Sequence, residues 1–174
     1  ATFIVLLFSK FLGSILILAT IWVYYFFRDP ERHPINDDSF LVSPADGLIT
    51  DISERTGPIE LQLENTTYTK VSIFMNVFNC HVNRTPLTGT VEEINYKPGK
   101  FLNASLDKAS DENERNYYKI KCSKSGEEII IVQIAGLIAR RIVCEVEQGQ
   151  SLKQGDRIGM IRFGSRVDIY FKNK

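Results

Sequence analysis

The pair Gly164-Ser165, close to the end of the 174-residue chain, is a place where side-chain and backbone groups could react together. Glycine has no Cβ, so its backbone accepts strained conformations and another group can approach its carbonyl closely. The Ser165 hydroxyl could attack that carbonyl, turn the peptide bond into an ester and make the ester a leaving group for β-elimination. Hydrolysis of the resulting dehydroalanine would leave a pyruvoyl group at a new N-terminus. A Gly-Ser pair alone usually marks a turn or a strand end, so this chemistry needs support from the rest of the chain.

Composition argues against several other kinds of chemistry. The 21 basic residues balance 21 acidic ones, so no net positive field indicates a nucleic-acid partner. The chain has two histidines and no cysteine cluster, which argues against a metal centre. Cys80, Cys122 and Cys144 form no Cys-x-x-Cys pair and leave an odd count, so we expect buried thiols and no disulfide framework.

Residues 1–27 predict a membrane anchor that delivers the domain to lipid without taking part in chemistry. Residues 11–27 carry no charge. At about 1.5 Å per residue this run reaches roughly 26 Å, slightly less than a hydrocarbon core of about 30 Å. A single tilted helix and a shallow hairpin turning near Gly13 both fit, whereas a buried core helix would show a polar side.

The run ends in aromatic residues, which are typical of a membrane interface and not of a signal-peptide cleavage site. Arg28 and Arg32 follow, so the positive-inside rule places the rest of the chain on the cytoplasmic side.

After the anchor, residues 28–174 predict one mainly β domain, a β-sandwich or barrel. Short runs of alternating or apolar residues are separated by turn pairs such as Asp-Gly and Pro-Gly. Residues 101–116 are polar and irregular, and a loop of that length in a compact domain is more often functional than idle. The expected strands are residues 40–43, 48–52, 59–63, 71–77, 88–96, 117–122, 128–134, 140–146, 158–163 and 167–171.

Six segments in order resemble the phosphatidylserine decarboxylase family in its short bacterial form. They are Phe-Phe-Arg-Asp-Pro-Glu-Arg (26–32), Ser-Pro-Ala-Asp-Gly (43–47), Phe-Met-Asn-Val-Phe-Asn-Cys-His-Val-Asn-Arg (74–84), Pro-Gly-Lys-Phe (98–101), Asn-Glu-Arg (113–115) and Phe-Gly-Ser (163–165). The resemblance covers nearly all of the chain after the anchor.

This resemblance implies a proenzyme that cuts itself between Gly164 and Ser165 into a β subunit (1–164) and an α subunit (165–174). The pyruvoyl group formed from Ser165 would be the cofactor, acting as an electron sink. It would decarboxylate phosphatidylserine to phosphatidylethanolamine, a step of phospholipid biosynthesis, at the cytoplasmic face of the bacterial inner membrane. No metal ion or nucleic acid is implied, and a homo-oligomer is left open.

The resemblance also implies roles for individual residues. His81 is the candidate for the general acid that protonates the decarboxylated carbon, because the unperturbed pKa of histidine lies near neutrality. Asp46 would orient or activate a base during self-cleavage, although Asp-Gly alone would be read as a turn. Longer relatives have a second histidine where Arg84 stands here. The base that activates Ser165 therefore stays open, and His81 would have to serve both steps if no other base exists.

Basic side chains are expected to meet the phosphate or carboxylate of the substrate. Arg115 is the first candidate, because it ends the irregular segment in Asn-Glu-Arg. Arg84 would stabilise charge, either on the oxyanion at Gly164 or on the phosphate, and Lys108 is a third candidate. Further basic residues that could serve are Lys100, Arg140 and Arg141.

Two other functions compete with this interpretation. Asp107-Lys108-Ala109 is the short signature of a lipoyl-carrier domain, so a membrane-tethered lipoyl- or biotinyl-type carrier is the alternative. Against it, the residues after Lys108 do not form the strand that should follow an acceptor lysine. An inactive, truncated relative is the other alternative, because the chain begins with Ala1 and stops at Lys174, where the family continues with further strands.

Overall fold

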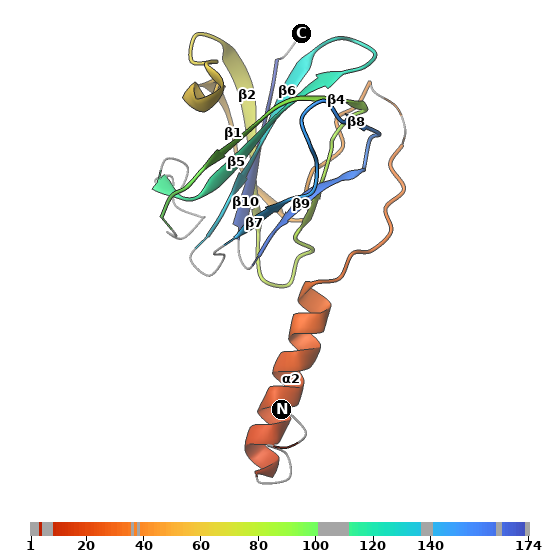
Figure 1. Cartoon of the computed structure of the whole chain (residues 1–174), viewed down its shortest axis with the longest axis vertical. Coiled ribbons are helices and arrows are strands. Elements are labelled where there is room, and N and C mark those ends of the chain that lie inside the picture. The colour runs from red at the N-terminus through yellow and green to blue at the C-terminus, as the bar shows by residue number, and fades with distance from the viewer. Residues whose placement is uncertain are drawn as a thin grey trace.

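Antiparallel strands form most of this computed structural model, which describes residues 4, 9–35, 37, 39–100, 112–136, 141–162 and 165–172. The strands are β1 (Leu48–Thr56), β2 (Thr67–Met75), β3 (Val82–Arg84), β4 (Gly89–Lys97), β5 (Arg115–Cys122), β6 (Glu128–Ile134), β7 (Ile142–Cys144), β8 (Ser151–Leu152), β9 (Arg157–Ile161) and β10 (Ser165–Phe171). They form a seven-stranded sheet in the order β1-β2-β10-β6-β5-β4-β8 and a three-stranded sheet in the order β3-β9-β7 (Figure 1). The expected mainly β fold is confirmed, and the sheets do not close on themselves.

The main core lies between the two sheets. Ile73 and Met75 of β2 and Val167 of β10 belong to one buried cluster with Ile158 and Ile161 of β9. Burying each such side chain contributes on the order of 2 kcal/mol. Because side chains alternate along a strand, the residues of β10 that face this core alternate with polar residues on the opposite face of the large sheet.

Two expected strands are wrong. Residues 59–63 alternate like a strand, but they contain a 3-10 helix, η1 (Ile59–Leu61), which begins after Pro58. Gln62 ends it with a left-handed φ of 56°, a conformation that a strand cannot hold. Residues 40–43 belong to no strand of either sheet. The 101–111 part of the expected functional loop lies outside the described residues.

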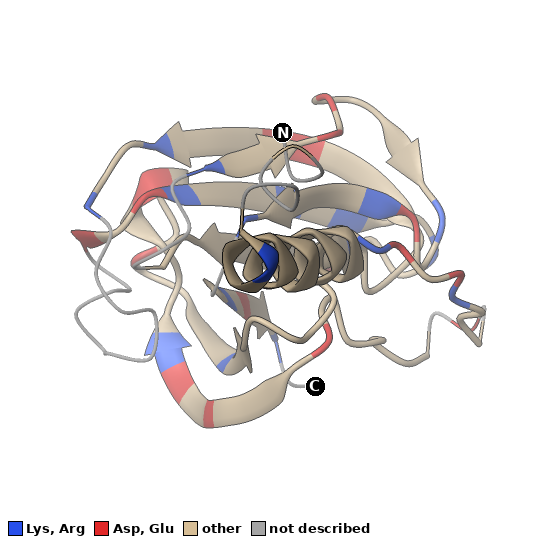
Figure 2. Ribbon diagram, turned by 90° about the horizontal axis from the view of Figure 1, so that it is seen from below, with Lys and Arg blue, Asp and Glu red and all other residues tan. Residues whose placement is uncertain are grey.

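The helix α2 (Lys10–Phe26) projects from the lower end of the β-sandwich (Figure 1). The Ser9 side chain caps its first turn by accepting a hydrogen bond from the Leu12 amide at 3.3 Å. The helix is continuous through Gly13, and its ribbon carries almost no charged residues when viewed from below (Figure 2). Among the residues that the structure describes, no helix is both long and apolar enough to cross a membrane.

Candidate active site

Ser165 is the first residue of β10 and sits in the interior of the sandwich. It pairs with Met75, the last residue of β2, and is fully buried. Its side chain shares a face with Val167, so it points toward the core between the sheets. The Ser165 Oγ has no hydrogen-bond partner among the described residues. A buried hydroxyl in this state costs on the order of 1–3 kcal/mol and calls for a functional explanation. Gly164 lies outside the described residues.

Asp46 lies at the same end of the large sheet as Ser165. In an antiparallel sheet the end of β2 meets the beginnings of β1 and β10, and Phe74 pairs with both Leu48 and Arg166. Asp46 comes two residues before Leu48. Gly47 holds this turn close to β2, because a Cβ there would lie 2.4 Å from the Phe74 carbonyl oxygen. The close approach that only glycine permits therefore brings Asp46 toward the start of β10.

His81 reaches this end of the molecule from the small sheet. It directly precedes β3, and its carbonyl accepts a hydrogen bond from the Ile161 amide at the end of β9, four residues before Ser165. The side chain is fully buried. Its Nδ1 lies 3.0 Å from the Asn79 carbonyl oxygen. In the neutral ring Nδ1–H donates to that oxygen, so Nε2 carries the lone pair.

The buried position of His81 alters its protonation. Burial lowers the pKa of His81 from 6.5 to about 4. The hydrogen bond to Asn79 opposes this shift, and the charge of Arg28 adds to it. At neutral pH the imidazole is therefore uncharged and able to accept a proton.

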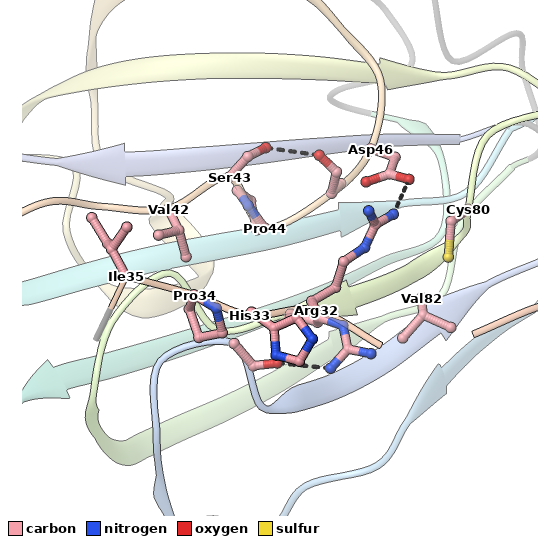
Figure 3. A pocket seen from close by; sticks show the side chains of 13 residues that line it. Arg32, His33, Pro34, Ile35, Val42, Ser43, Pro44, Asp46, Cys80 and Val82 are labelled. Atoms are coloured by element: carbon pink, nitrogen blue, oxygen red, sulfur yellow. Dashed lines mark hydrogen bonds and ion pairs between the residues drawn. The ribbon is translucent and has the colours of Figure 1, made fainter. Parts of the chain in front are cut away.

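A cavity of about 300 Å³ opens beside these residues (Figure 3). Cys80 and Val82, the neighbours of His81 in the sequence, form one wall, and Asp46 forms part of another. Arg32 reaches across the cavity to Asp46 at 2.5 Å, with both side chains partly exposed. Sequence reasoning missed Arg32 as a site residue. The available signal was its place in Arg-Asp-Pro-Glu-Arg, one of the segments that carry the family resemblance.

Arg84 also lines the cavity, but its guanidinium already binds other groups of the protein. It donates to Asp29 Oδ1 at 2.7 Å and to the Gly155 carbonyl at 2.8 Å. Asp29 forms a second ion pair with Arg157 of β9. These contacts fasten the segment that follows α2 to the small sheet. A role for Arg84 in stabilising charge at Gly164 or on a phosphate stays a prediction.

Arg115 lies on the other face of the large sheet from Ser165. Arg166, Ile134 and Arg115 stand opposite one another across three strands, and Arg166 alternates with Ser165. Arg115 pairs with Glu60 at 3.4 Å and lines a separate cavity of about 360 Å³. The structure therefore does not bring Arg115 together with His81 and Asp46, and its role in binding substrate stays a prediction.

The structure describes only some of the other basic candidates. Lys108 and Arg140 lie outside the described residues. Lys100 is exposed and pairs with Glu112 at 3.0 Å. Within the described ranges, no three His, Cys, Asp or Glu side chains are grouped closely enough to hold a metal ion.

Comparison with known proteins supports the resemblance in the sequence. The profile of the family described as phosphatidylserine decarboxylase matches residues 19–174. The phosphatidylserine decarboxylase proenzyme of Pelagibacter ubique is 68% identical over 165 residues, covering 95% of this chain and 76% of that protein. The proenzyme of Cereibacter sphaeroides is 55% identical, and the match covers 91% of this chain and 68% of that protein. The proenzyme of Rickettsia akari is 52% identical, and the match covers 99% of this chain and 74% of that protein. The chain belongs to the phosphatidylserine decarboxylase family.

Proposed function

We propose that this chain is a proenzyme that cuts itself between Gly164 and Ser165 and then decarboxylates phosphatidylserine to phosphatidylethanolamine. The observation that carries the proposal is the Ser165 hydroxyl, which is buried at the start of β10 without a hydrogen-bond partner among the described residues. Membership of a family whose relatives are named proenzymes supports it.

His81 is suited to move the protons of self-cleavage. As a neutral base it takes the Ser165 Oγ proton at Nε2 while Oγ attacks the Gly164 carbonyl carbon. The imidazolium so formed is a strong acid, because burial lowers the pKa of His81 to about 4. It gives the proton to the Ser165 amide nitrogen as the peptide bond breaks and the ester forms. Neutral His81 can then take the Ser165 Cα proton while the Gly164 carboxylate leaves, and hydrolysis of the dehydroalanine releases ammonia.

Asp46 assists from the cavity side. Its carboxylate can orient a base or hold positive charge close to the cleavage point, and Arg32 fixes its position at 2.5 Å. Because both side chains are partly exposed, their pairing energy is modest. The Arg32 guanidinium can therefore turn toward an anionic substrate group without a large cost in stability.

A pyruvoyl group at residue 165 would supply the electron sink for decarboxylation. The surroundings of Ser165 fit such a group, because Ser165 is fully buried and its hydroxyl has no hydrogen-bond partner among the described residues. His81 would take up a proton at Nε2 from the substrate ammonium group and later give it to the decarboxylated carbon. The products of cleavage would be a β subunit (1–164) and an α subunit beginning at residue 165.

Placement of the enzyme at a membrane is part of the same proposal. Large apolar side chains along α2 are exposed, among them Phe11, Leu12, Ile15, Leu18 and Ile21. Such a surface is stable when it is buried in lipid. Arg28 and Arg32 after the helix favour the cytoplasmic face of the bacterial inner membrane.

Intact mass analysis of the purified chain tests the proposal. We expect two fragments that meet between residues 164 and 165, with the smaller one blocked to Edman sequencing by a terminal carbonyl. Ser165→Ala should give one uncut chain without decarboxylase activity. An uncut wild-type chain, or phosphatidylserine decarboxylation by Ser165→Ala free of host enzyme, would overturn it.

A further inference from the structure

The last turn of α2 packs directly onto His81. Phe26 is fully buried, whereas Tyr24 is 85% exposed in the same turn. The ring centroids of Phe26 and His81 lie 4.4 Å apart, with 36° between the ring planes. An aromatic ring at this distance covers one side of the imidazole and keeps water from it. Trp22 contacts Phe26 from the preceding turn, with 5.9 Å between ring centroids.

Polar contacts hold the end of the helix to the segment that carries His81. Arg28 donates to the Phe78 carbonyl at 2.9 Å and to the Tyr25 carbonyl at 3.0 Å. The Cys80 thiol lies 3.4 Å from the Arg28 carbonyl oxygen. Phe78 and Cys80 stand on either side of Asn79, whose carbonyl fixes the His81 ring. Movement of the helix end would therefore act on the group that orients the imidazole.

We propose that Phe26 is a positioning residue for His81, so that the apolar helix forms one wall of the catalytic site. Its ring presses the imidazole against the Asn79 carbonyl and excludes water from it. The same helix carries its exposed apolar side chains away from the β domain, so its placement in lipid and the geometry of His81 are mechanically linked. The importance of this link for catalysis rests on the proposed function, whereas the effect on the His81 ring does not.

By excluding water, Phe26 also disfavours the protonated form of His81. Arg28 is the charged group that acts on the ring, and its charge opposes protonation. Phe26→Ala would admit water and raise the pKa of His81, because a hydrated imidazolium is more stable than a buried one. Phe26→Leu, which keeps an apolar side chain of similar reach, should preserve most of the shift.

The chain contains two histidines, so a titration followed by NMR resolves each of them. We would label the histidine rings in the full-length Ser165→Ala chain, which stays uncut, and titrate it in neutral detergent micelles. Phe26→Ala should raise the His81 midpoint by about one pH unit or more, equivalent to tenfold in proton affinity. Tyr24→Ala, which removes an exposed aromatic ring from the same turn, is the matched control and should leave the midpoint unchanged. His33 distinguishes a local change from a general one.

A second measurement connects the ring to the reaction. In chains that retain Ser165, Phe26→Ala should move the acidic limb of the pH profile of self-cleavage upward by the same amount, and Phe26→Leu should restore it. An unchanged His81 midpoint in Phe26→Ala, or an equal shift in Tyr24→Ala, would overturn the proposal. Failure of the chain to cut itself would remove the proposed function but leave the NMR result decisive for Phe26.

Discussion

The side chain of Gln133 donates a 2.7 Å hydrogen bond to the side chain of Asn83, and this bond joins the large sheet to the small sheet. Gln133 lies in β6 and accepts a hydrogen bond from the Tyr118 hydroxyl at 2.6 Å. Asn83 stands two residues after His81, and its amide lies 3.6 Å from the sulfur of Met75, the residue paired with Ser165. All of these side chains are buried. The bond therefore helps to fix the spacing between His81 and Ser165, which come from different sheets.

Gln133→Leu should lower both the stability and the rate of self-cleavage. The substitution keeps the approximate volume but leaves Asn83 without its donor, a loss of about 1–3 kcal/mol in the free energy of unfolding. Gln150→Leu is the matched control, because the Gln150 side-chain oxygen accepts an exposed hydrogen bond from the Glu147 amide. Urea unfolding of uncut chains and cleavage followed on gels would measure the two effects. Equal stability of the two variants would show that the cross-sheet bond contributes little.

Arg84→Lys should loosen the segment that connects α2 to the β-sandwich. A lysine keeps the charge but cannot reach Asp29 and the Gly155 carbonyl together, as the planar guanidinium does. We expect trypsin to cut after Arg28 or Arg32 several times faster in this variant. Arg55→Lys, at an exposed position of β1, is the control. Unchanged digestion would mean that the ion pair between Arg157 and Asp29 holds the segment without Arg84.

The sequence predicts best those parts of the fold that repeat over short distances. Residues 71–77 and 128–134 could be recognised because their apolar pattern suits strands. The second range is that of β6, whereas the first overlaps β2 only over residues 71–75. The same pattern misled at residues 59–63, where the backbone conformations of Pro58 and Gln62 override it. The strands β3 and β8 are too short to show a pattern of their own.

The residues of the candidate site also differ in how well the sequence predicts them. Ser165, His81 and Asp46 could be named as candidates because each lies in a short segment that resembles the family, and their roles stay predictions. Phe26 also lies in such a segment, but its role, like that of Gln133, depends on contacts with residues about 50 positions away and could not be predicted. A buried aromatic ring at the end of an apolar helix looks like the rest of the helix until the fold places it against an imidazole.

Asp46→Asn and Arg32→Gln should have different effects on self-cleavage. Asp46→Asn removes the carboxylate that we propose assists cleavage, so we expect slower cleavage by roughly 10²-fold, the lower range for groups that assist proton transfer. Arg32→Gln breaks the same 2.5 Å ion pair but leaves the carboxylate in place, so cleavage should stay within tenfold of wild type. Cleavage on gels after synthesis in a cell-free system would separate them. Equal slowing by both would assign the effect to the ion pair and not to the carboxylate.

The free energy of unfolding of the uncut Ser165→Ala chain should decrease as the pH is lowered from 6.5 to about 4. The pKa of His81 is about 4 in the folded chain and 6.5 as its ordinary value, so the unfolded chain binds more protons in this range. The free energy of unfolding therefore rises with pH across the window, and the contribution of His81 is lost as the pH falls through it. The difference amounts to roughly 3 kcal/mol, since one pKa unit corresponds to about 1.4 kcal/mol.

His81→Gln in the same uncut background isolates this contribution. Carboxyl groups titrate in both chains, including Asp168, whose pKa is raised by burial, so their effects cancel in the comparison. Urea unfolding at several pH values should show a steeper loss of stability on acidification in the chain that retains His81. Parallel curves for the two chains would mean that the imidazole is hydrated, and that it cannot serve as the buried neutral base that self-cleavage at Ser165 requires.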